Sequence, residues 1–400
     1  MPMTIHPDSS AHRIFMVLDS IYPSTGGGGA ESQVGTLSQW LASQGIPCTI
    51  VVPMVPYGPQ TAHEVHGLVE IVRLRYPVLP ALGGLVLLVR LAALLLRRRQ
   101  EIQAIHCHIA KNMAATATLV NRLLRKPLLT KLTGMTESVG GILDPAAASL
   151  PNRIRRRILQ QGRVQAISHA IARQLRQAGF APDRILEIPN GVDLDRFAPV
   201  PTPPPDSPFT VLFVGRLEAV KGIDVLIDAW GQAFDAGQPV RLLLAGAGSL
   251  HDRLQAQVEQ QGRSHQIRFL GRQDDIVQLM TQAHVGVLPS HTEGLSNTLL
   301  ESQAMGLPMI GSRISGNEDF IQPDVTGWLF PPGDTAALAD CLRAAYRLER
   351  RQLAALGARA REQLRIRASI PAVGHRLLAA YGLDVATPVT ARTPSNQPDS

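Results

Sequence analysis

The run Arg13-Ile-Phe-Met-Val-Leu18, followed by Thr25-Gly-Gly-Gly-Gly29, decides the fold class of this chain. The apolar run predicts a buried strand, and the glycines lead into a predicted helix from about Glu31 to Gln44. A second apolar run, Cys48 to Val52, completes a unit of strand, glycine loop, helix and strand. Such a unit is typical of a parallel sheet that helices cover on both faces, and it predicts an α/β fold.

The same alternation continues on both sides of a proline-rich segment. In the first half, strand-like runs recur at Ile102 to His106 and Leu128 to Leu132. Six prolines then fall between Pro199 and Pro208, which predicts an extended linker. Beyond it the pattern restarts, with strands expected at 210–214, 240–244, 266–270 and 285–288. Helices are expected at 223–234, after the second of these strands to about residue 261, at 296–304 and within 336–381.

The length of 400 residues also exceeds the size at which one hydrophobic core keeps growing, so two domains are expected. After Leu383 the chain is rich in Thr, Pro, Ser and Asp, which predicts a disordered tail. The predicted parts are a first α/β domain (1–198), a linker (199–208) and a second α/β domain (209–368). A C-terminal helix that returns to the first domain (369–383) and the tail (384–400) follow.

The composition restricts the partners of the chain. It carries 39 Lys and Arg against 32 Asp and Glu, a formal charge of +7, which favours an anionic partner. Aromatic residues make up only 4% and do not alternate with basic ones, so we expect no nucleic-acid binding. A phosphate-bearing substrate or an anionic lipid fits better. The N-terminal residues show no apolar run before the first strand and the cysteines are widely spaced (Cys48, Cys107 and Cys341), which predicts reduced thiols and a cytoplasmic location.

Residues Val78 to Leu96 form an almost wholly apolar stretch, followed by Arg97 to Arg99. A membrane-spanning helix is one interpretation. Arg90, however, would cost about 3 kcal/mol near the centre of a bilayer, and a spanning segment would interrupt the first domain. We therefore favour a packed or interfacial helix.

Two acidic residues lie eight positions apart in Glu293-Gly-Leu-Ser-Asn-Thr-Leu-Leu-Glu301, and a helix is predicted to begin between them. If Ser296 or a neighbour caps this helix, its free N–H groups and its dipole point toward an anion such as a diphosphate. Glu293 could then accept hydrogen bonds from sugar hydroxyls, and Glu301 could reach a ribose. A capped helix with ordinary surface acids explains the spacing equally well.

A basic turn follows the first strand of the second domain, in Gly215-Arg216-Leu217 and Lys221-Gly222. Ligands of open α/β sheets gather at the carboxyl ends of strands, where two cations could neutralise a diphosphate. A solvated basic turn without function is the alternative.

Together with Ala304-Met-Gly-Leu-Pro308 and Thr326-Gly-Trp-Leu-Phe330, these motifs occur in an order that resembles the retaining GT-B glycosyltransferases of glycosyltransferase family 4. Ile188-Pro-Asn-Gly-Val-Asp193 is also typical of that family. The resemblance covers roughly residues 12–382. It implies two facing Rossmann-like domains with a deep cleft between them, and a nucleotide-sugar donor bound by the second domain.

The resemblance also assigns roles by position. Arg216 and Lys221 match the pair that binds the donor diphosphate, Glu293 the acid that contacts the donor sugar, and Glu301 the ribose ligand. Leu270, in Phe269-Leu-Gly271, matches the turn whose backbone reads the base. The helix start beneath the phosphates would comprise Gly294, Leu295, Ser296 and Asn297.

In the first domain, Gly27 and Gly28 resemble a glycine loop that approaches the donor phosphate and the acceptor, although a simple tight turn is the alternative. His106-Cys-His108 matches a stretch of the family whose second histidine faces the sugar, so His108 is the candidate catalytic residue. A metal-binding histidine pair is the other interpretation, but no third ligand is apparent. Asp193-x-Asp195 could likewise be a metal-binding pair, yet its turn context favours a capping role.

The resemblance thus implies transfer of a sugar from a nucleotide donor to a glycan or lipid-linked acceptor, with retention of configuration and without metal or other cofactor, in cell-envelope or exopolysaccharide synthesis. The acceptor stays open, because Thr133-Gly134-Met135 replaces a turn that bears a histidine in many relatives. Arg97 to Arg99 and the basic segment 152–159 predict contact with an anionic membrane, unless they form a solvated basic face. A silent scaffold, an epimerase and a phosphorylase of the same architecture are the competing functions.

Overall fold

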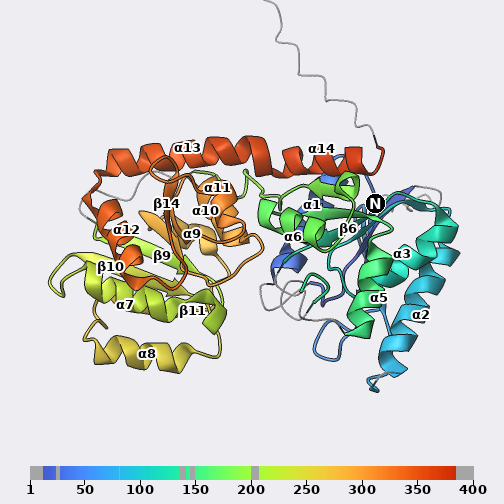
Figure 1. Cartoon of the computed structure of the whole chain (residues 1–400), viewed down its shortest axis with the longest axis horizontal. Coiled ribbons are helices and arrows are strands. Elements are labelled where there is room, and N and C mark those ends of the chain that lie inside the picture. Colours follow the sequence, from blue (N-terminus) through green and yellow to red (C-terminus); the bar gives the residue numbers. More distant parts are fainter. Residues whose placement is uncertain are drawn as a thin grey trace, which may run out of the picture.

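The computed structural model of the chain describes residues 12–23, 28–80, 82–134, 141–144, 149–199 and 207–383. These residues form two α/β domains that lie side by side, with a pair of C-terminal helices running along one edge of both (Figure 1). The predicted two-domain architecture is therefore confirmed. The predictions for Gly27, for most of the linker at 199–208 and for the tail at 384–400 lie outside the described residues.

The N-terminal sheet has eight strands in the order β3-β4-β2-β1-β5-β6-β7-β8. Its described neighbours pair in parallel, except that β3 runs antiparallel to β4. The side chains of β1 alternate between two buried faces, Phe15 on one and Ile14 on the other, which explains the uninterrupted apolar run of this strand. The strands are β1 (Arg13–Val17), β2 (Cys48–Pro53), β3 (His63–His66), β4 (Val69–Leu74), β5 (Ile102–Cys107), β6 (Leu128–Leu132), β7 (Arg163–Ala166) and β8 (Ile185–Glu187).

Helices cover both faces of this sheet. They are α1 (Gly29–Ser43), α2 (Leu82–Arg97), α3 (Asn112–Leu124), α5 (Leu150–Leu159) and α6 (His169–Gln177), with a 3₁₀ turn at Pro182–Arg184. Helix α2 buries Leu87, Leu91 and Leu95 in the core, so the apolar stretch Val78 to Leu96 contains a packed helix, as favoured above. Within the described ranges, no helix is both long and apolar enough to cross a membrane.

The C-terminal sheet has six parallel strands in the order β11-β10-β9-β12-β13-β14. The strands are β9 (Phe209–Val214), β10 (Val240–Ala245), β11 (Ile267–Gly271), β12 (Val285–Leu288), β13 (Met309–Ser312) and β14 (Gly327–Phe330). Around them lie a 3₁₀ turn at Ala219–Lys221, α7 (Ile223–Ala233), α8 (His251–Gln260), α9 (Ile276–Met280), α10 (Asn297–Ala304), α11 (Asn317–Phe320) and α12 (Thr335–Arg347).

Two further helices connect the domains at their common edge. Helix α13 (Arg350–Ala368) lies along the C-terminal domain, and α14 (Ile370–Ala380) continues over the N-terminal one (Figure 1). Ser369 separates them and caps α14, accepting a hydrogen bond from the backbone N–H of Ala372. Helix α14 packs on α1, where the rings of Trp40 and His375 meet edge to face at 5.4 Å.

Candidate functional site

Each sheet has a point at which the strand order reverses, and the predicted residues gather there. In the N-terminal sheet β1 lies between β2 and β5, and in the C-terminal sheet β9 lies between β10 and β12. From each of these first strands the chain builds the sheet to one side and then crosses over to build the other side. Ligands of open α/β sheets bind at the carboxyl ends of strands at such switch points. Gly28 follows β1 and His108 follows β5, while Lys221 follows β9 and Glu293 follows β12.

Lys221 and Glu293 form an ion pair at the switch point of the C-terminal domain. Their side chains are 13% and 7% exposed, and the hydroxyl of Ser290 donates a second hydrogen bond of 3.0 Å to the same carboxylate oxygen. Gly222 adopts a left-handed conformation with φ 62°, and a Cβ there would lie 2.3 Å from the carbonyl oxygen of Pro289. The close fit of this glycine brings the lysine turn against the loop that carries Glu293.

Arg216 lies on the same edge of the sheet but is exposed. Among the described residues it makes neither a hydrogen bond nor an ion pair, whereas Lys221 is held by Glu293. The two predicted cations thus differ. One is buried in fixed geometry, and the other is a free guanidinium at the surface of the site.

Helix α10 begins directly after the Glu293 loop. Ser296 occupies the N-cap position, as predicted, but its hydroxyl makes no capping hydrogen bond. The N–H groups at the start of α10 consequently have no side-chain cap, which suits a helix end that binds an anion.

The two domains touch where this loop meets the end of β6. A Cβ on Gly294 would lie 1.7 Å from the carbonyl oxygen of Thr133, so only glycine permits the contact. On the other side of the loop, the carbonyl of Gly294 accepts a hydrogen bond of 3.1 Å from Ser315, whose hydroxyl also bonds Ser168 of the N-terminal domain at 2.7 Å. Leu295, between these contacts, is buried.

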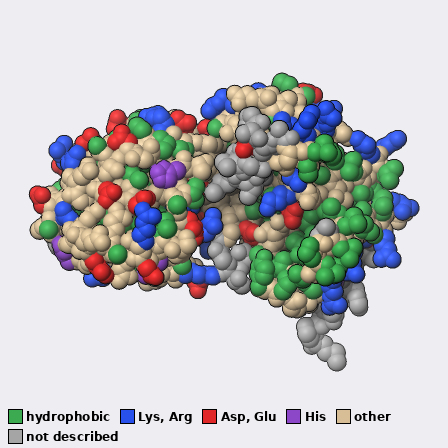
Figure 2. All heavy atoms as spheres, turned by 60° about the horizontal axis from the view of Figure 1, so that its bottom comes forward, with side chains coloured by type: hydrophobic (Ala, Val, Ile, Leu, Met, Phe, Trp, Pro, Cys, Tyr) green, Lys and Arg blue, Asp and Glu red, His purple; other side chains and the backbone are tan. Residues whose placement is uncertain are grey.

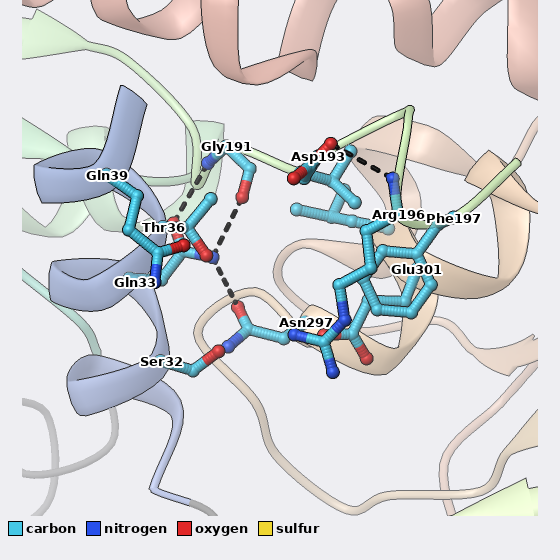
Figure 3. Close-up of a pocket in the computed structure, with 12 residues that line it drawn as sticks. Ser32, Gln33, Thr36, Gln39, Gly191, Asp193, Arg196, Phe197, Asn297 and Glu301 are labelled. Atoms are coloured by element: carbon cyan, nitrogen blue, oxygen red, sulfur yellow. Dashed lines mark hydrogen bonds between the residues drawn. The ribbon is translucent and has the colours of Figure 1, made fainter. Parts of the chain in front are cut away.

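Asn297, the first residue of α10, contacts the N-terminal domain, and Figure 3 shows its hydrogen bond with Gln33 of α1. Its amide nitrogen donates to the carbonyl of Gly29 at 3.1 Å, and its amide oxygen accepts from Gln33 at 3.2 Å and from Asn190 at 3.0 Å. The amide oxygen thus accepts two hydrogen bonds and the amide nitrogen donates one, all of them to the N-terminal domain.

Glu301 lies one turn further along α10, in a pocket between the domains (Figure 3). Burial raises the pKa of its carboxyl group to about 7, and the charge of Arg196 opposes this shift. The pocket is lined by Ser32, Gln33, Thr36, Gln39, Gly191, Val192, Asp193, Arg196, Phe197, Asn297, Leu300 and Glu301. Of the predicted donor ligands in the described ranges, this pocket therefore brings Glu301 together with Asn297 but not with Lys221 or Glu293.

His108 is buried just beyond the end of β5, with its backbone N–H bonded to the carbonyl of Val17 at 2.8 Å. Neither ring nitrogen has a hydrogen-bond partner among the residues that the structure describes. The ring stacks on that of His106, with the centroids 4.1 Å apart. Burial lowers the pKa of His108, so the ring is neutral and can serve as donor and acceptor.

The remaining predicted residues occupy the edges of the site. Gly28 is the N-cap of α1, which also lacks a side-chain cap. Leu270 is half-buried in the edge strand β11, and its carbonyl accepts a bond of 2.6 Å from Gln273. The carboxylate of Asp193 accepts the backbone N–H groups of Asp195 and Arg196, as the capping interpretation predicts.

Several residues of the site carry no sequence signal by themselves. Gln33 bonds both Asn297 and the backbone of Gly191, and Ser290 holds Glu293. A single Gln on a helix or a Ser in a loop looks like surface sequence. Asn190, by contrast, lies in the segment from Ile188 to Asp193 already singled out, so the motif indicated this position without its partner.

Comparison with known proteins accounts for both halves of the chain. Residues 27–196 match the family described as Glycosyltransferase Family 4, and residues 196–363 match Glycosyl transferases group 1. The chain is 30% identical over 300 residues to D-inositol 3-phosphate glycosyltransferase of Xylanimonas cellulosilytica, covering 67% of this chain and 68% of that one. It is 35% identical over 198 residues to phosphatidyl-myo-inositol mannosyltransferase of Mycobacterium leprae, covering 48% of this chain and 52% of that one.

The chain spans about half the length of the first curated relatives it matches, at 51% to 52%. Its fold is similar to that of Anabaena Alr3699/HepE, crystallised in complex with UDP, with a TM-score of 0.74 and 20% identity over 92% of this chain and 99% of that one. The two family matches, the relative from Xylanimonas and this fold together show that the chain belongs to the GT-B glycosyltransferases, with a Glycosyltransferase Family 4 domain followed by a group 1 domain.

Proposed function

We propose that this protein transfers a hexose from a nucleoside diphosphate sugar to a glycan or lipid-linked acceptor. The observation that carries the proposal is the buried pair Lys221–Glu293 beside the open N-terminus of α10, at the switch point of the C-terminal sheet. The pair places one cation and one hydrogen-bond acceptor side by side, as a diphosphate and a sugar require. UDP in the related Anabaena structure and the sugar transfer named for the relatives support the same reaction class.

In the proposed mechanism, Arg216, Lys221 and the first N–H groups of α10 bind the donor diphosphate. Negative charge grows on the leaving phosphate as the glycosidic bond breaks, and preorganised cations in a site that excludes water stabilise that charge selectively. Glu293 orients Lys221 and accepts hydrogen bonds from the donor sugar. His108 contacts the sugar from the other domain. We propose that the reaction needs no metal or cofactor and retains the anomeric configuration.

The competing functions differ in what they do with the donor. A silent scaffold leaves it intact, an epimerase changes its sugar without an acceptor, and a phosphorylase needs inorganic phosphate as a reactant. Donor binding is tested first by thermal shift and calorimetry with UDP-, GDP- and ADP-sugars. A specific donor at 100 times its Kd should add about 2.7 kcal/mol to the free energy of unfolding. No stabilisation by any of them would contradict the proposed function.

The proposed lipid-linked acceptor agrees with an apolar surface on the N-terminal domain. Figure 2 shows hydrophobic side chains gathered over this domain, with Lys and Arg side chains around them. Helix α2 contributes Leu82, Leu85 and Val89, which are 50% to 60% exposed. Helix α3 packs on α2 and helix α5 packs on α3, and these two helices add Leu119, Leu123, Leu150 and Ile154. An apolar face rimmed by cations is typical of a protein that docks on an anionic membrane, here proposed as the cytoplasmic side in cell-envelope or exopolysaccharide synthesis.

The basic rim differs from the prediction at one residue. Arg98 does not face outward with Arg97 and Arg99, because it forms ion pairs with Glu70 at 2.8 Å and Glu101 at 2.5 Å. Its guanidinium also lies 5.1 Å from the ring centre of Phe15. Of the three arginines, Arg97 and Arg99 are the exposed ones that can contact lipid.

Membrane docking is tested by sedimentation with vesicles. The protein should partition onto anionic vesicles and not onto neutral ones, and salt should release it, since each basic residue near the surface adds about 1 kcal/mol. The double substitution Leu85→Ser and Val89→Ser should weaken binding, while Ile366→Ser, an equally exposed site on the other domain, should not. Equal partition onto neutral and anionic vesicles, unaffected by salt, would contradict the docking proposal.

The carboxyl group of Glu301 predicts a pH dependence of donor binding. Ribose hydroxyls donate to the ionised form, which predominates only above the pKa of about 7. The affinity for a nucleoside diphosphate should therefore rise as the pH passes from 6 to 8. In the protein without donor, a rise in pH has the opposite effect, because it lowers the contribution of Glu301 to the free energy of unfolding. The folded state holds a proton that the unfolded state, with a pKa of 4.5, has lost, so the contribution of Glu301 to stability declines between about pH 4.5 and 7.

Calorimetry at several pH values measures the donor effect, and thermal unfolding measures the stability effect. Glu301→Gln should remove both pH dependences and weaken the donor at pH 8. Glu259→Gln, an exposed substitution of the same kind in the same domain, serves as the control. An unchanged pH dependence in Glu301→Gln would show that another group is responsible.

A further inference from the structure

A cluster of polar side chains is buried on one face of the N-terminal sheet, near the carboxyl ends of its strands. Lys131 of β6 lies beside Gln165 of β7 in the sheet, and Cys107 of β5 lies beside Thr130 of β6. One residue further along, His108 is therefore level with Lys131 and Gln165. Since side chains alternate along strands, these three share a face with His106. All four are 1% to 4% exposed.

The hydrogen bonds of His106 fix its tautomer. The amide nitrogen of Gln165 donates to the carbonyl of Ile188 at 2.8 Å, so the amide oxygen of Gln165 accepts from Nε2 of His106 at 3.1 Å. Nδ1 then carries the lone pair and accepts from the hydroxyl of Tyr381 at 2.7 Å. Burial, and next the charge of Lys131, lower the pKa of His106 to about 3. His106 is thus neutral, and its hydrogen bonds are complete.

Lys131 and His108 differ from His106 because they lack protein partners. Among the described residues, Lys131 has no hydrogen bond and no ion pair, and both ring nitrogens of His108 are unsatisfied. A buried ammonium without a counter-charge is strongly unfavourable, and burial lowers the pKa of Lys131 to about 7. The two imidazoles whose electrostatic effects reach it are neutral. Within the part of the chain that the structure describes, the cluster therefore combines one amine that can ionise and one neutral donor with no anion.

The place of the cluster identifies the anion it lacks. Two residues beyond Lys131, the carbonyl of Thr133 meets Gly294, the neighbour of Glu293. Lys131 thus lies two residues from the junction between the domains, on its N-terminal side, and the Lys221–Glu293 pair lies on the C-terminal side. The diphosphate of the donor already has its cations in the C-terminal domain. A second anion on the N-terminal side belongs to the other substrate.

We propose that Lys131 and His108 bind an anionic group of the acceptor, either a phosphate ester or a carboxylate. The ammonium supplies the charge, and the N–H of the neutral His108 ring supplies a directed hydrogen bond, while the other ring nitrogen stays for the proposed contact with the donor sugar. Tyr381 and Gln165 hold His106 in place as the surface on which His108 stacks. The inference rests on the proposed function, since it treats the N-terminal domain as the acceptor side.

The chain lends itself to a direct test, because it has only four lysines: Lys111, Lys126, Lys131 and Lys221. In wild-type protein labelled with ¹³C at lysine Cε, each side chain gives its own signal, assigned by single substitutions. The signals are followed against pH with methyl phosphate, with sodium acetate, and with glycerol plus sodium chloride at equal ionic strength. Methyl phosphate or acetate should raise the midpoint of Lys131 by about one to three pH units, since a nearby opposite charge favours the ionised form.

His106 and His108, whose pKa values burial and also the charge of Lys131 lower, are neutral over this pH range and do not mimic the effect. The stronger of the two anions identifies the class of acceptor group. An unchanged midpoint of Lys131 with both anions would overturn the inference. Lys221 reports on the donor site in the same samples. If UDP, GDP and ADP all fail to move Lys221 while an anion moves Lys131, the proposed function fails and the anion site stands.

A matched pair of substitutions gives an independent measurement. Lys131→Met should weaken methyl phosphate or acetate about ten- to a hundredfold in calorimetry on protein saturated with the bound nucleotide, since it removes a charged hydrogen bond. Lys126→Met removes the same charge near the opposite end of β6 and should leave the affinity unchanged. Equal affinity in the wild type and Lys131→Met would contradict the proposal.

Discussion

Arg216→Ala and Lys221→Ala should each lower kcat by about 10² to 10³, with smaller effects on the KM for the donor. The reason is that negative charge on the leaving diphosphate develops in the transition state, where one preorganised donor is typically worth about 2.7–4 kcal/mol. Steady-state kinetics with the donor identified by calorimetry measure the effect. Arg268→Ala, which removes an exposed arginine from the same domain, is the control. A loss below tenfold in both variants would indicate a basic turn without a role in catalysis.

The two variants should differ in stability although they agree in activity. Arg216 is exposed and unpaired among the described residues, so its removal should leave the free energy of unfolding nearly unchanged. Lys221→Ala leaves the buried carboxylate of Glu293 without its partner, which typically costs about 3–5 kcal/mol. Chemical denaturation separates this loss from the loss of catalysis.

The same assays test the proposal that the reaction needs no metal. Activity of the wild type should survive excess EDTA, because Arg216 and Lys221 take the electrostatic role that a divalent ion has in other transferases. Activity that chelation abolishes and magnesium or manganese restores would refute this part of the mechanism.

Glu293→Gln should reduce transfer by a similar factor, about 10² or more. The amide keeps the shape of the side chain, but it replaces an acceptor-only carboxylate with a group that is half donor, and it removes the negative partner of Lys221. Both the contact to the sugar and the orientation of the lysine are lost. Turnover under donor saturation measures the effect, with Glu259→Gln as the control.

A double-mutant cycle shows whether Glu293 acts through Lys221. If the two work as one unit, the double variant Lys221→Ala with Glu293→Gln should lose little more activity than either single variant. Fully multiplicative losses would mean that the two side chains contribute independently. Wild-type turnover in Glu293→Gln would reject the assignment of this site.

The sequence predicted the centre of each sheet better than its edges. Strands β1, β2, β5 and β6 were predicted from their apolar residues, which are buried on both faces of the sheet. Strand β3, His63 to His66, is mostly exposed and pairs only with β4, so it has no apolar run that could reveal it. Strands β13 and β14 were not predicted; each has only four residues, and each contains a glycine at its start or centre.

The candidate site shows a similar division. The motifs indicated Lys221 and Glu293 separately, but their ion pair joins residues 72 positions apart and depends on β9 lying next to β12. No local pattern gives that adjacency. Arg98 was misjudged for the same reason, because its ion pairs with Glu70 and Glu101 turn it inward.

The most direct test of sugar transfer is analysis of the products. Purified protein is incubated with the donor that binds, with and without lipid and glycan extracts, and nucleoside diphosphate and sugar products are quantified by NMR and mass spectrometry. We expect nucleoside diphosphate and one glycosylated product in equal amounts, formed only with the extract, and at least a hundredfold less in Glu293→Gln. Conversion of the donor sugar without any acceptor, or a donor that stays intact with every extract, would contradict a glycosyltransferase.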